Sequence, residues 1–496
     1  MMKIYIWILF SLLVAGGCES LEDTYRDYAG DGTVRYLGKC TDIKVTPGWK
    51  RLNVTWSNSI DPVIDKIRVS WTLNRITQDS LIDRNATECN IPNLEDGNYE
   101  VTVRGVDGKG NGSLPISAFG RPYTPVHEAV RAFSRLIGKY YFVGNRLVLF
   151  FSSWQENIVS ATLNYYSGGS LRKLELNKEL LSQEQYLLPD AIDPGTEVFL
   201  EREGQLEGCT DLIVFDPWKL LPEKLYTTDF RRLVKEKYGQ AEITDAFVNG
   251  QEELEIDYEI TSFEDILNFP NLKTLVLGKN RFLKEEYLNY YRSDSKLNEL
   301  ERGLFVLDVA NKVYGLKVKR YNQHYLPGKT LPYMEEMGNP VAPDIPCMDG
   351  RDWKITCSEK DSETYDAHLE NLFDGNLLNW WQPEALPEVR TYEIVVDMKE
   401  TKTVNGVKIV QKDFDPENDP MSRNLLSSRI KIRVSADNMV WKEATYVEEN
   451  TLGASSGEIN ILKFSAPKEA RYLKFIVSDR PYGKNFSVAL AEIGVF

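Results

Sequence analysis

The chain has 496 residues, which predicts three or four domains with sizeable cores at roughly 150 residues per domain. Its formal net charge of −15 argues against duplex nucleic acid or anionic lipid as the main partner, because both require a cationic surface. The hydrophobic fraction of 42% and charged fraction of 27% exclude a polytopic membrane protein and a disordered chain, while 26 Tyr and ten Trp favour a β-rich fold.

Residues 1–17 have the form of a cleavable export signal. Lys3 precedes an apolar run, 4–14, that is too short to span a bilayer as a mature helix, and the small residues 15–17 lead into Cys18. Small residues directly before a cysteine resemble the lipobox of bacterial lipoproteins, in which the cysteine becomes the lipidated first residue. Ala15 stands where Leu is commoner. The alternative is an ordinary secretory signal that leaves a free cysteine near the cut.

Residues 18–33 form the expected lipid anchor and linker. Glu19, Glu22 and Asp23 make an acidic tract that resembles the surface-export signal of Bacteroidetes lipoproteins, which implies an outer-membrane anchor facing outward. Acyl chains at Cys18 would hold the protein at the membrane without a transmembrane helix, because each buried methylene contributes about 0.8 kcal/mol. We therefore expect the lipid to be the sole membrane contact.

Five further cysteines form no CxxC pair, so neither zinc nor a thioredoxin-like dithiol is indicated. Two disulfides are compatible with an oxidising compartment, Cys40 with Cys89 and Cys347 with Cys357. Buried free thiols are the alternative.

Residues 34–123 predict a β-sandwich, because short alternating strands such as RLNVTWS and NYEVTVRGVD recur between turn signals. Several landmarks resemble the fibronectin type III family: Pro47, Gly48, Trp56, Leu94, Gly97 and Tyr99. The resemblance implies that Tyr99 makes a tyrosine corner. Residues 124–219 repeat the alternation, as in RLVLFFSS and IVSATLNYYS, and predict a second fibronectin-like sandwich. Paired modules of this type in Bacteroidetes surface lipoproteins usually act as spacers.

Residues 220–345 predict a small α/β module. FRRLVKEKYG is typical of a helix, and Leu272, Leu275, Leu277 and Asn280 fit the leucine-rich-repeat phrase LxxLxLxxN, in which the Asn side chain bonds backbone. Leu254 and Ile256 precede Leu275 and Leu277 by one period of 21 residues, and a further rung is expected at Leu304, Leu307 and Val309. So short a solenoid needs its neighbours as caps, so we interpret it as a structural module.

Residues 346–496 carry the clearest pattern. From Asp352 onward the landmarks are Trp353 and then LFDGNLLNWW, EIVVDM, VNGVKIV, RIKIRVSADNMVWKEA, ARYLKFIVS and LAEIGVF. In this order they resemble the discoidin family, also called coagulation factor V/VIII type C. The resemblance implies an eight-stranded jelly-roll sandwich. Among bacterial secreted proteins it points chiefly to family 32 carbohydrate-binding modules, which attach proteins to galactose- or hexosamine-containing glycans.

The phrase LFDGNLLNWW crowds oxygen ligands around Gly375, as loops that bind hard cations do. In the family this turn holds a structural Ca²⁺. The resemblance implies ligands from Asn371, Asp374, Asn376, Asn379 and Glu492, although Asn379 stands where the family usually has Thr. The alternative is a metal-free turn held by Asx hydrogen bonds.

Sugar recognition in such modules uses loops at one tip, where an aromatic ring stacks on the sugar and polar side chains bond its hydroxyls. Three loops qualify: the segment before the DGN turn, the acidic loop DFDPENDPMSRNLLSS and the loop DRPYGKNFS. The candidates that they supply are His368, Arg423, Asn424, Tyr482, Asn485 and Phe486. Each also has a purely structural alternative: Tyr482 would hold its loop in place, Phe486 would lie in the core and Arg423 would pair with a carboxylate. Trp380 and Trp381 face opposite ways in extended chain, so at least one is expected in the core.

The chain lacks familiar catalytic motifs: there are three His, and HEAVR at His127 is not HExxH. We therefore predict a mainly β, multidomain, non-catalytic cell-surface lipoprotein that captures glycan for a polysaccharide-uptake system, with an outer-membrane transporter as partner. The alternative is an adhesin that binds protein through the leucine-rich and fibronectin-like modules. A third interpretation, membrane insertion of Leu425 and Leu426, is disfavoured by the acidic loop beside them.

Overall fold

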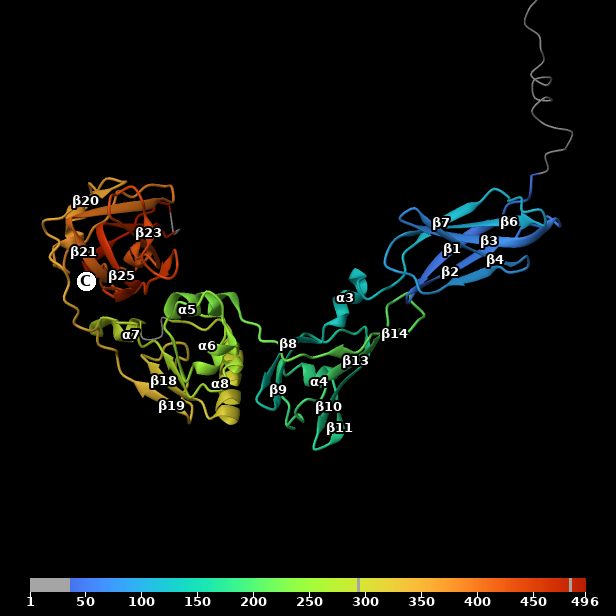
Figure 1. The fold of residues 1–496 in the computed structure, drawn as a ribbon, viewed down its shortest axis with the longest axis horizontal. Coiled ribbons are helices and arrows are strands. Elements are labelled where there is room, and N and C mark those ends of the chain that lie inside the picture. Colours follow the sequence, from blue (N-terminus) through green and yellow to red (C-terminus); the bar gives the residue numbers. More distant parts are fainter. Residues whose placement is uncertain (1–35, 292–294, 481–483) are drawn as a thin grey trace, which may run out of the picture.

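The computed structural model describes residues 36–291, 295–480 and 484–496, so the export signal, Cys18 and Tyr482 lie outside the described residues. The fold is mainly β and multidomain, as predicted. Figure 1 shows four bodies in a row, from the first sandwich in blue to the C-terminal domain in orange and red. Within the described ranges, no helix combines the length and apolar composition needed to cross a bilayer.

The first domain is a sandwich of two antiparallel sheets, with strand orders β1-β2-β5 and β4-β3-β6-β7. Alternation builds its core, since Leu52, Val54 and Trp56 are buried between partly exposed neighbours. Tyr99 is buried and its hydroxyl accepts a hydrogen bond from the Glu95 N–H at 3.2 Å, as a tyrosine corner requires. The strands are β1 (Thr41–Gly48), β2 (Arg51–Ser57), β3 (Ile64–Leu73), β4 (Ile76–Asp83), β5 (Glu88–Ile91), β6 (Tyr99–Asp107) and β7 (Ile116–Gly120).

The second domain is a sandwich with the same strand order. In both domains the second strand lies between the first and the fifth, and the third lies between the fourth and the sixth. The fibronectin type III resemblance stays a prediction for both. The elements are α3 (Glu128–Ser134), β8 (Ile137–Val143), β9 (Arg146–Phe151), β10 (Ile158–Ser167), β11 (Ser170–Glu175), α4 (Lys178–Leu181), β12 (Gln185–Leu187), β13 (Phe199–Gly204), β14 (Ile213–Val214) and β15 (Trp218–Lys219).

Specific contacts join the two sandwiches. The Arg51 guanidinium donates to both Asp211 oxygens, from Nε at 2.7 Å and Nη2 at 2.5 Å, and the Trp49 N–H donates to the same carboxylate at 2.8 Å. The Trp49 ring lies 6.0 Å from the Phe215 ring. A bidentate pair fixes an orientation as well as a distance, so this junction holds the two domains in a defined arrangement.

The third domain is built on four parallel strands in the order β16-β17-β18-β19. The predicted period of 21 residues is confirmed, because Leu254 pairs with Leu275 and Ile256 with Leu277. All four side chains are fully buried. The elements are α5 (Thr228–Tyr238), α6 (Asp245–Gly250), β16 (Glu253–Ile256), η1 (Glu264–Asn268), β17 (Thr274–Leu277), η2 (Glu285–Tyr287), α7 (Leu288–Tyr291), α8 (Leu300–Tyr314), β18 (Lys317–Tyr321) and β19 (Met334–Met337).

Two details of the repeat prediction are wrong. Leu304, Leu307 and Val309 lie in helix α8, where a spacing of three places residues on one face, and the next rung is β18, with Val318 beside Leu275. The Asn280 amide donates to the carboxylates of Asp257 and Glu255 at 2.9 and 3.2 Å, not to backbone.

The third domain shares a core with the second. Tyr141, Val143, Val148 and Phe150 of β8 and β9 pack in one apolar cluster with the leucines of β16 and β17. The Arg302 guanidinium lies 4.8 Å from the centre of the Phe150 ring. A continuous core couples the two domains mechanically.

The C-terminal domain is a discoidin-like β-sandwich. The expected eight strands are seven in the described residues, because β21 and β25 run through bulges as single strands of 21 and 20 residues. The elements are β20 (Lys354–Cys357), η3 (Leu369–Phe373), β21 (Thr391–Gln411), η4 (Pro420–Leu425), β22 (Arg429–Ser435), β23 (Lys442–Glu443), β24 (Asn450–Thr451), β25 (Ile459–Ser478) and β26 (Leu490–Val495).

The five described cysteines are free thiols, so neither conceivable disulfide is formed. Cys40 and Cys209 are buried, and Cys347 is exposed. Burial raises the pKa of the Cys40 thiol, which keeps it protonated and unreactive at neutral pH.

Candidate functional site

The predicted glycan loops meet around one extended segment, residues 380–386. Backbone hydrogen bonds join this segment to the 361–368 loop and to residues 486–490. The acidic loop reaches the same place, because the Ala489 N–H donates to the Leu425 carbonyl at 2.8 Å. Loops far apart in sequence are thus brought to one place, which we call the loop cluster (residues 361–368, 380–386, 412–425 and 484–486).

The two adjacent tryptophans divide between core and rim, as extended chain requires. Trp381 is fully buried, stands edge-on to Tyr392 with ring centres 5.8 Å apart, and donates from Nε1 to Asp361 at 3.1 Å. Trp380 is half-buried, and the Lys412 Nζ lies 4.3 Å from the centre of its ring. Burial lowers the pKa of Lys412, and the aromatic face partly compensates the desolvated ammonium.

An exposed aromatic side chain lies beside Trp380. Tyr365 is 51% exposed, and its ring centre lies 6.4 Å from that of Trp380. Three residues further along, the His368 side chain is 57% exposed and its Nε2 lies 2.7 Å from an Asp366 oxygen. An exposed ring in the same short loop as an imidazole and carboxylates is a combination that can stack on a sugar face and bond its hydroxyls.

The sequence-predicted candidates are distributed unevenly in this cluster. Phe486 is half-buried and its backbone pairs with Leu386, whereas Asn485 is exposed and Asn424 is half-buried. Tyr482 lies outside the described residues. Arg423 lines a cavity between the C-terminal domain and the third domain, so it serves a different part of the surface from His368.

The predicted cation turn brings four of its five residues together. Asp374 accepts from the Asn376 N–H and from the Asn379 amide, both at 2.7 Å, and Glu492 accepts from the Gly375 N–H at 3.1 Å. The Asn371 amide instead donates to the Trp380 carbonyl at 2.9 Å, so it ties the turn to the loop cluster. These Asx bonds are those of the metal-free alternative.

Two observations nevertheless fit a hard cation at this turn. The Asn379 Oδ1 atom is buried and accepts no hydrogen bond. Burial, together with the nearby Asp374 charge, raises the pKa of Glu492 to about 7. An unsatisfied amide oxygen beside two carboxylates provides the oxygen ligands that Ca²⁺ prefers. Within the described part of the chain, no group of three or more His, Cys, Asp or Glu is placed to hold a metal, so amides and carbonyls would complete this set.

Sequence reasoning missed three side chains of the cluster. Tyr365 was hidden in the polar loop DSETYDAH, where its distance of three residues from His368 was the available signal. The Trp380 ring was left unassigned because alternation alone does not say which of two neighbours faces out. Lys412 reaches Trp380 from a strand end that carries no motif.

Two protein-family models match parts of the chain. A family described as a domain of unknown function matches residues 18–200, which cover the first sandwich and most of the second. The F5/8 type C domain matches residues 354–492, which confirms the discoidin resemblance of the C-terminal domain. A comparison with curated proteins gives no match.

Solved structures of similar proteins include three from different sources. One is the module CpGH89CBM32-5 from Clostridium perfringens, in complex with GalNAc-β-1,3-galactose. It is 16% identical with a TM-score of 0.25, and the match covers 30% of this chain and 99% of the module. A putative chitobiase fragment from Bacteroides thetaiotaomicron is 20% identical with a TM-score of 0.25, covering 31% and 93%. A two-domain fibronectin type III segment from chicken tenascin is 13% identical with a TM-score of 0.19, covering 37% and 100%.

Proposed function

We propose that this protein is a non-catalytic, cell-surface glycan-binding protein that captures carbohydrate through the loop cluster of its discoidin-like domain. The observation that carries the proposal is the exposed Tyr365 ring beside Trp380, in the same loop as His368 and within a region that matches the F5/8 type C domain. The nearby Asp361 carboxylate has a structural role, which agrees with binding without catalysis. It accepts hydrogen bonds from the Trp381 indole and from the Leu369 N–H and thereby holds the loops.

Each side chain has a distinct role in this proposal. The Tyr365 ring stacks on the apolar face of a sugar, and His368 and Asp366 bond its hydroxyls. Trp380 lies beside the Tyr365 ring, with Lys412 over its own ring, and the Gln382 amide oxygen holds it by accepting from its indole at 3.2 Å. Phe486 and Asn485 border the same segment and extend the contact surface.

Replacing Tyr365 tests the proposal most directly. Tyr365→Ala is expected to weaken glycan binding by about tenfold, equivalent to about 1.4 kcal/mol, because it removes the stacking ring while leaving the buried core intact. The measurement is retention of the full chain on affinity gels or glycan arrays that contain galactose- and hexosamine-bearing glycans.

Tyr166→Ala is the matched control, because Tyr166 is 38% exposed on strand β10 of the second sandwich, far from the cluster in sequence and domain. It should leave retention unchanged. If the unmodified chain binds no glycan, or if Tyr365→Ala binds as well as the unmodified chain, the proposal is wrong.

We also propose that the turn at Gly375 holds a structural Ca²⁺, with Asp374, Asn376, Asn379 and Glu492 as ligands. When bound, the cation would neutralise the two facing carboxylates and satisfy the orphaned Asn379 oxygen. It would hold the loop cluster in shape and would take no part in chemistry.

Calcium is therefore expected to raise the melting temperature of the C-terminal domain, and a chelator to lower it. A ligand whose free concentration is 100 times its Kd stabilises the folded state by about 2.7 kcal/mol. Differential scanning calorimetry with and without chelator is the measurement, and Glu492→Gln should remove the calcium response. A transition that does not respond to chelator would contradict the proposal.

The location is proposed on the sequence features alone. We infer that Cys18 is lipidated and that the protein lies on the outer face of an outer membrane, in a glycan-uptake system with a transporter partner. The first three domains would then act as a spacer for the C-terminal domain (Figure 1). Mass spectrometry of the mature N-terminus decides the anchor, because an unmodified Cys18 would contradict it.

A further inference from the structure

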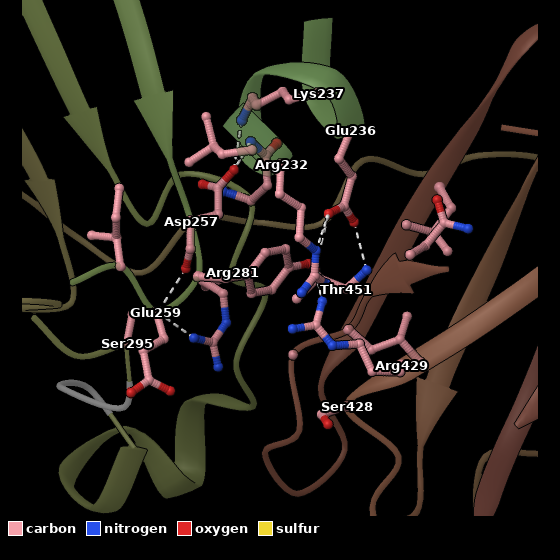
Figure 2. A pocket seen from close by; sticks show the side chains of 18 of the residues that line it. Arg232, Glu236, Lys237, Asp257, Glu259, Arg281, Ser295, Ser428, Arg429 and Thr451 are labelled. Atoms are coloured by element: carbon pink, nitrogen blue, oxygen red, sulfur yellow. Dashed lines mark hydrogen bonds and ion pairs between the residues drawn. The ribbon is translucent and has the colours of Figure 1, made fainter. Parts of the chain in front are cut away.

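A cavity of about 1580 Å³ lies between the third domain and the C-terminal domain. One wall comes from helix α5 and from the chain beyond the ends of β16 and β17, and the other from residues of the C-terminal sandwich, including Arg429, Thr451 and Lys463. Figure 2 shows Arg232 and Glu236 of helix α5 reaching Thr451 of the opposite wall, with Arg429 beside it. The volume exceeds that of a usual small-molecule pocket, so it suits an extended ligand such as several linked sugars.

The carboxylates that line the cavity are mostly engaged. Lys237 Nζ lies 2.7 Å from Glu255 and 2.5 Å from Asp257. Glu236 accepts from the Thr451 hydroxyl at 2.9 Å, and Asp229 accepts from the Thr261 N–H at 2.6 Å. Glu259 is exposed. The negative charge of this lining is therefore largely neutralised or bonded by the protein itself.

Four of the lining cations are less engaged than the carboxylates. Lys296, Lys463 and Arg480 are exposed, and among the described residues none of them has a carboxylate partner. Arg429 donates to the Thr451 hydroxyl, which carries no charge. These four side chains, among the eight Lys and Arg that line the cavity in the described structure, give a locally positive surface on a chain whose net charge is −15.

The cavity also offers an aromatic surface and a firm frame. Tyr446 is 45% exposed at its edge, where its ring lies against Gly239 and leaves no room for a Cβ. The two walls are joined by a buried ion pair, in which Arg281 Nε lies 2.5 Å from Glu458 and the side chains are 4% and 0% exposed. Because this pair fixes the distance between the domains, the cavity is a preorganised feature.

We propose that this cavity binds an acidic segment of a glycan, a saccharide bearing carboxylate or sulfate groups. The inference rests on the proposed glycan function and adds a second site that the third domain helps to build. Arg429 and Arg480 would hold the acidic group, since guanidinium groups bind such anions in a bidentate manner. Because the protein as a whole is negatively charged, the rest of its surface repels polyanions. An acidic glycan therefore needs a local group of cations such as the one in this cavity.

The test compares acidic and neutral polymers on the full chain by isothermal titration, with polygalacturonate and chondroitin sulfate as acidic probes and galactan as the neutral probe. The double variant Lys463→Gln/Arg480→Gln changes two exposed side chains, so its fold should be intact. We expect it to bind its acidic probe about three- to tenfold more weakly, with galactan binding unchanged. The matched control is Lys399→Gln/Lys442→Gln, two exposed lysines that do not line the cavity.

The outcomes separate the two proposals. A loss confined to the cavity variant supports the inference, and which probe responds identifies carboxylate or sulfate as the recognised group. Equal loss in the control, unchanged affinity in the cavity variant, or no binding of either acidic probe would overturn it. Loss of galactan binding in Tyr365→Ala tests the loop cluster alone. If the cavity variant shows no effect, the result for the loop cluster still stands. A negative result at the loop cluster likewise leaves the cavity result unchanged.

Discussion

Trp381→Ala should lower the free energy of unfolding of the C-terminal domain by about 3–5 kcal/mol, the usual cost of removing a large buried aromatic side chain. Trp381 is fully buried, and its backbone pairs with Leu490. Its indole also donates to Asp361, so the variant leaves that carboxylate without one of its donors. Urea unfolding followed by circular dichroism measures the change.

The neighbouring tryptophan is the matched control. Trp380 is half-buried at the rim, so Trp380→Ala should cost clearly less stability than Trp381→Ala. Because Trp380 supports the loop cluster, it should still weaken glycan binding. Equal destabilisation by the two substitutions would show that the division into core and rim is wrong.

Breaking the ion pair between the third and C-terminal domains should have an effect of similar size. Glu458→Leu removes the carboxylate that pairs with the buried Arg281 guanidinium, and breaking a buried ion pair from one side typically costs about 3–5 kcal/mol. Glu458 also accepts from the Ser455 N–H at 3.0 Å, so the loop that borders the cavity should loosen. Calorimetry of the full chain is expected to show a lower transition temperature for the two domains.

A second variant separates charge from packing. Arg281→Met/Glu458→Leu removes both charges and should recover most of the lost stability, because a buried ion pair adds little over apolar side chains of similar volume. Lys178 and Glu156 form an exposed pair, so Glu156→Gln should barely change the melting curve. If Glu458→Leu melts like the unmodified chain, the pair does not join the domains.

Local patterns determined much of the fold. The alternation in RLNVTWS places Leu52 and Val54 in a sheet core whatever the partner strand, and a 21-residue period between Leu254 and Leu275 is visible without coordinates. The phrase around Gly375 likewise predicted that Asp374 and Asn379 lie side by side. The rung expected at Leu304 was wrong because a leucine spacing of three also suits a helix, and only packing decides between the two.

What the sequence could determine by itself was therefore the class of each domain and the segments that carry the candidate site. Tertiary structure decided which side chains meet: Tyr365 with Trp380, Lys412 with the indole face, and Arg423 turned to the cavity between domains. The reason is physical. Periodicity records only which side of its own strand or helix a residue occupies, whereas a binding site depends on the relative placement of segments that are joined by distant contacts, such as the pair Arg281 and Glu458.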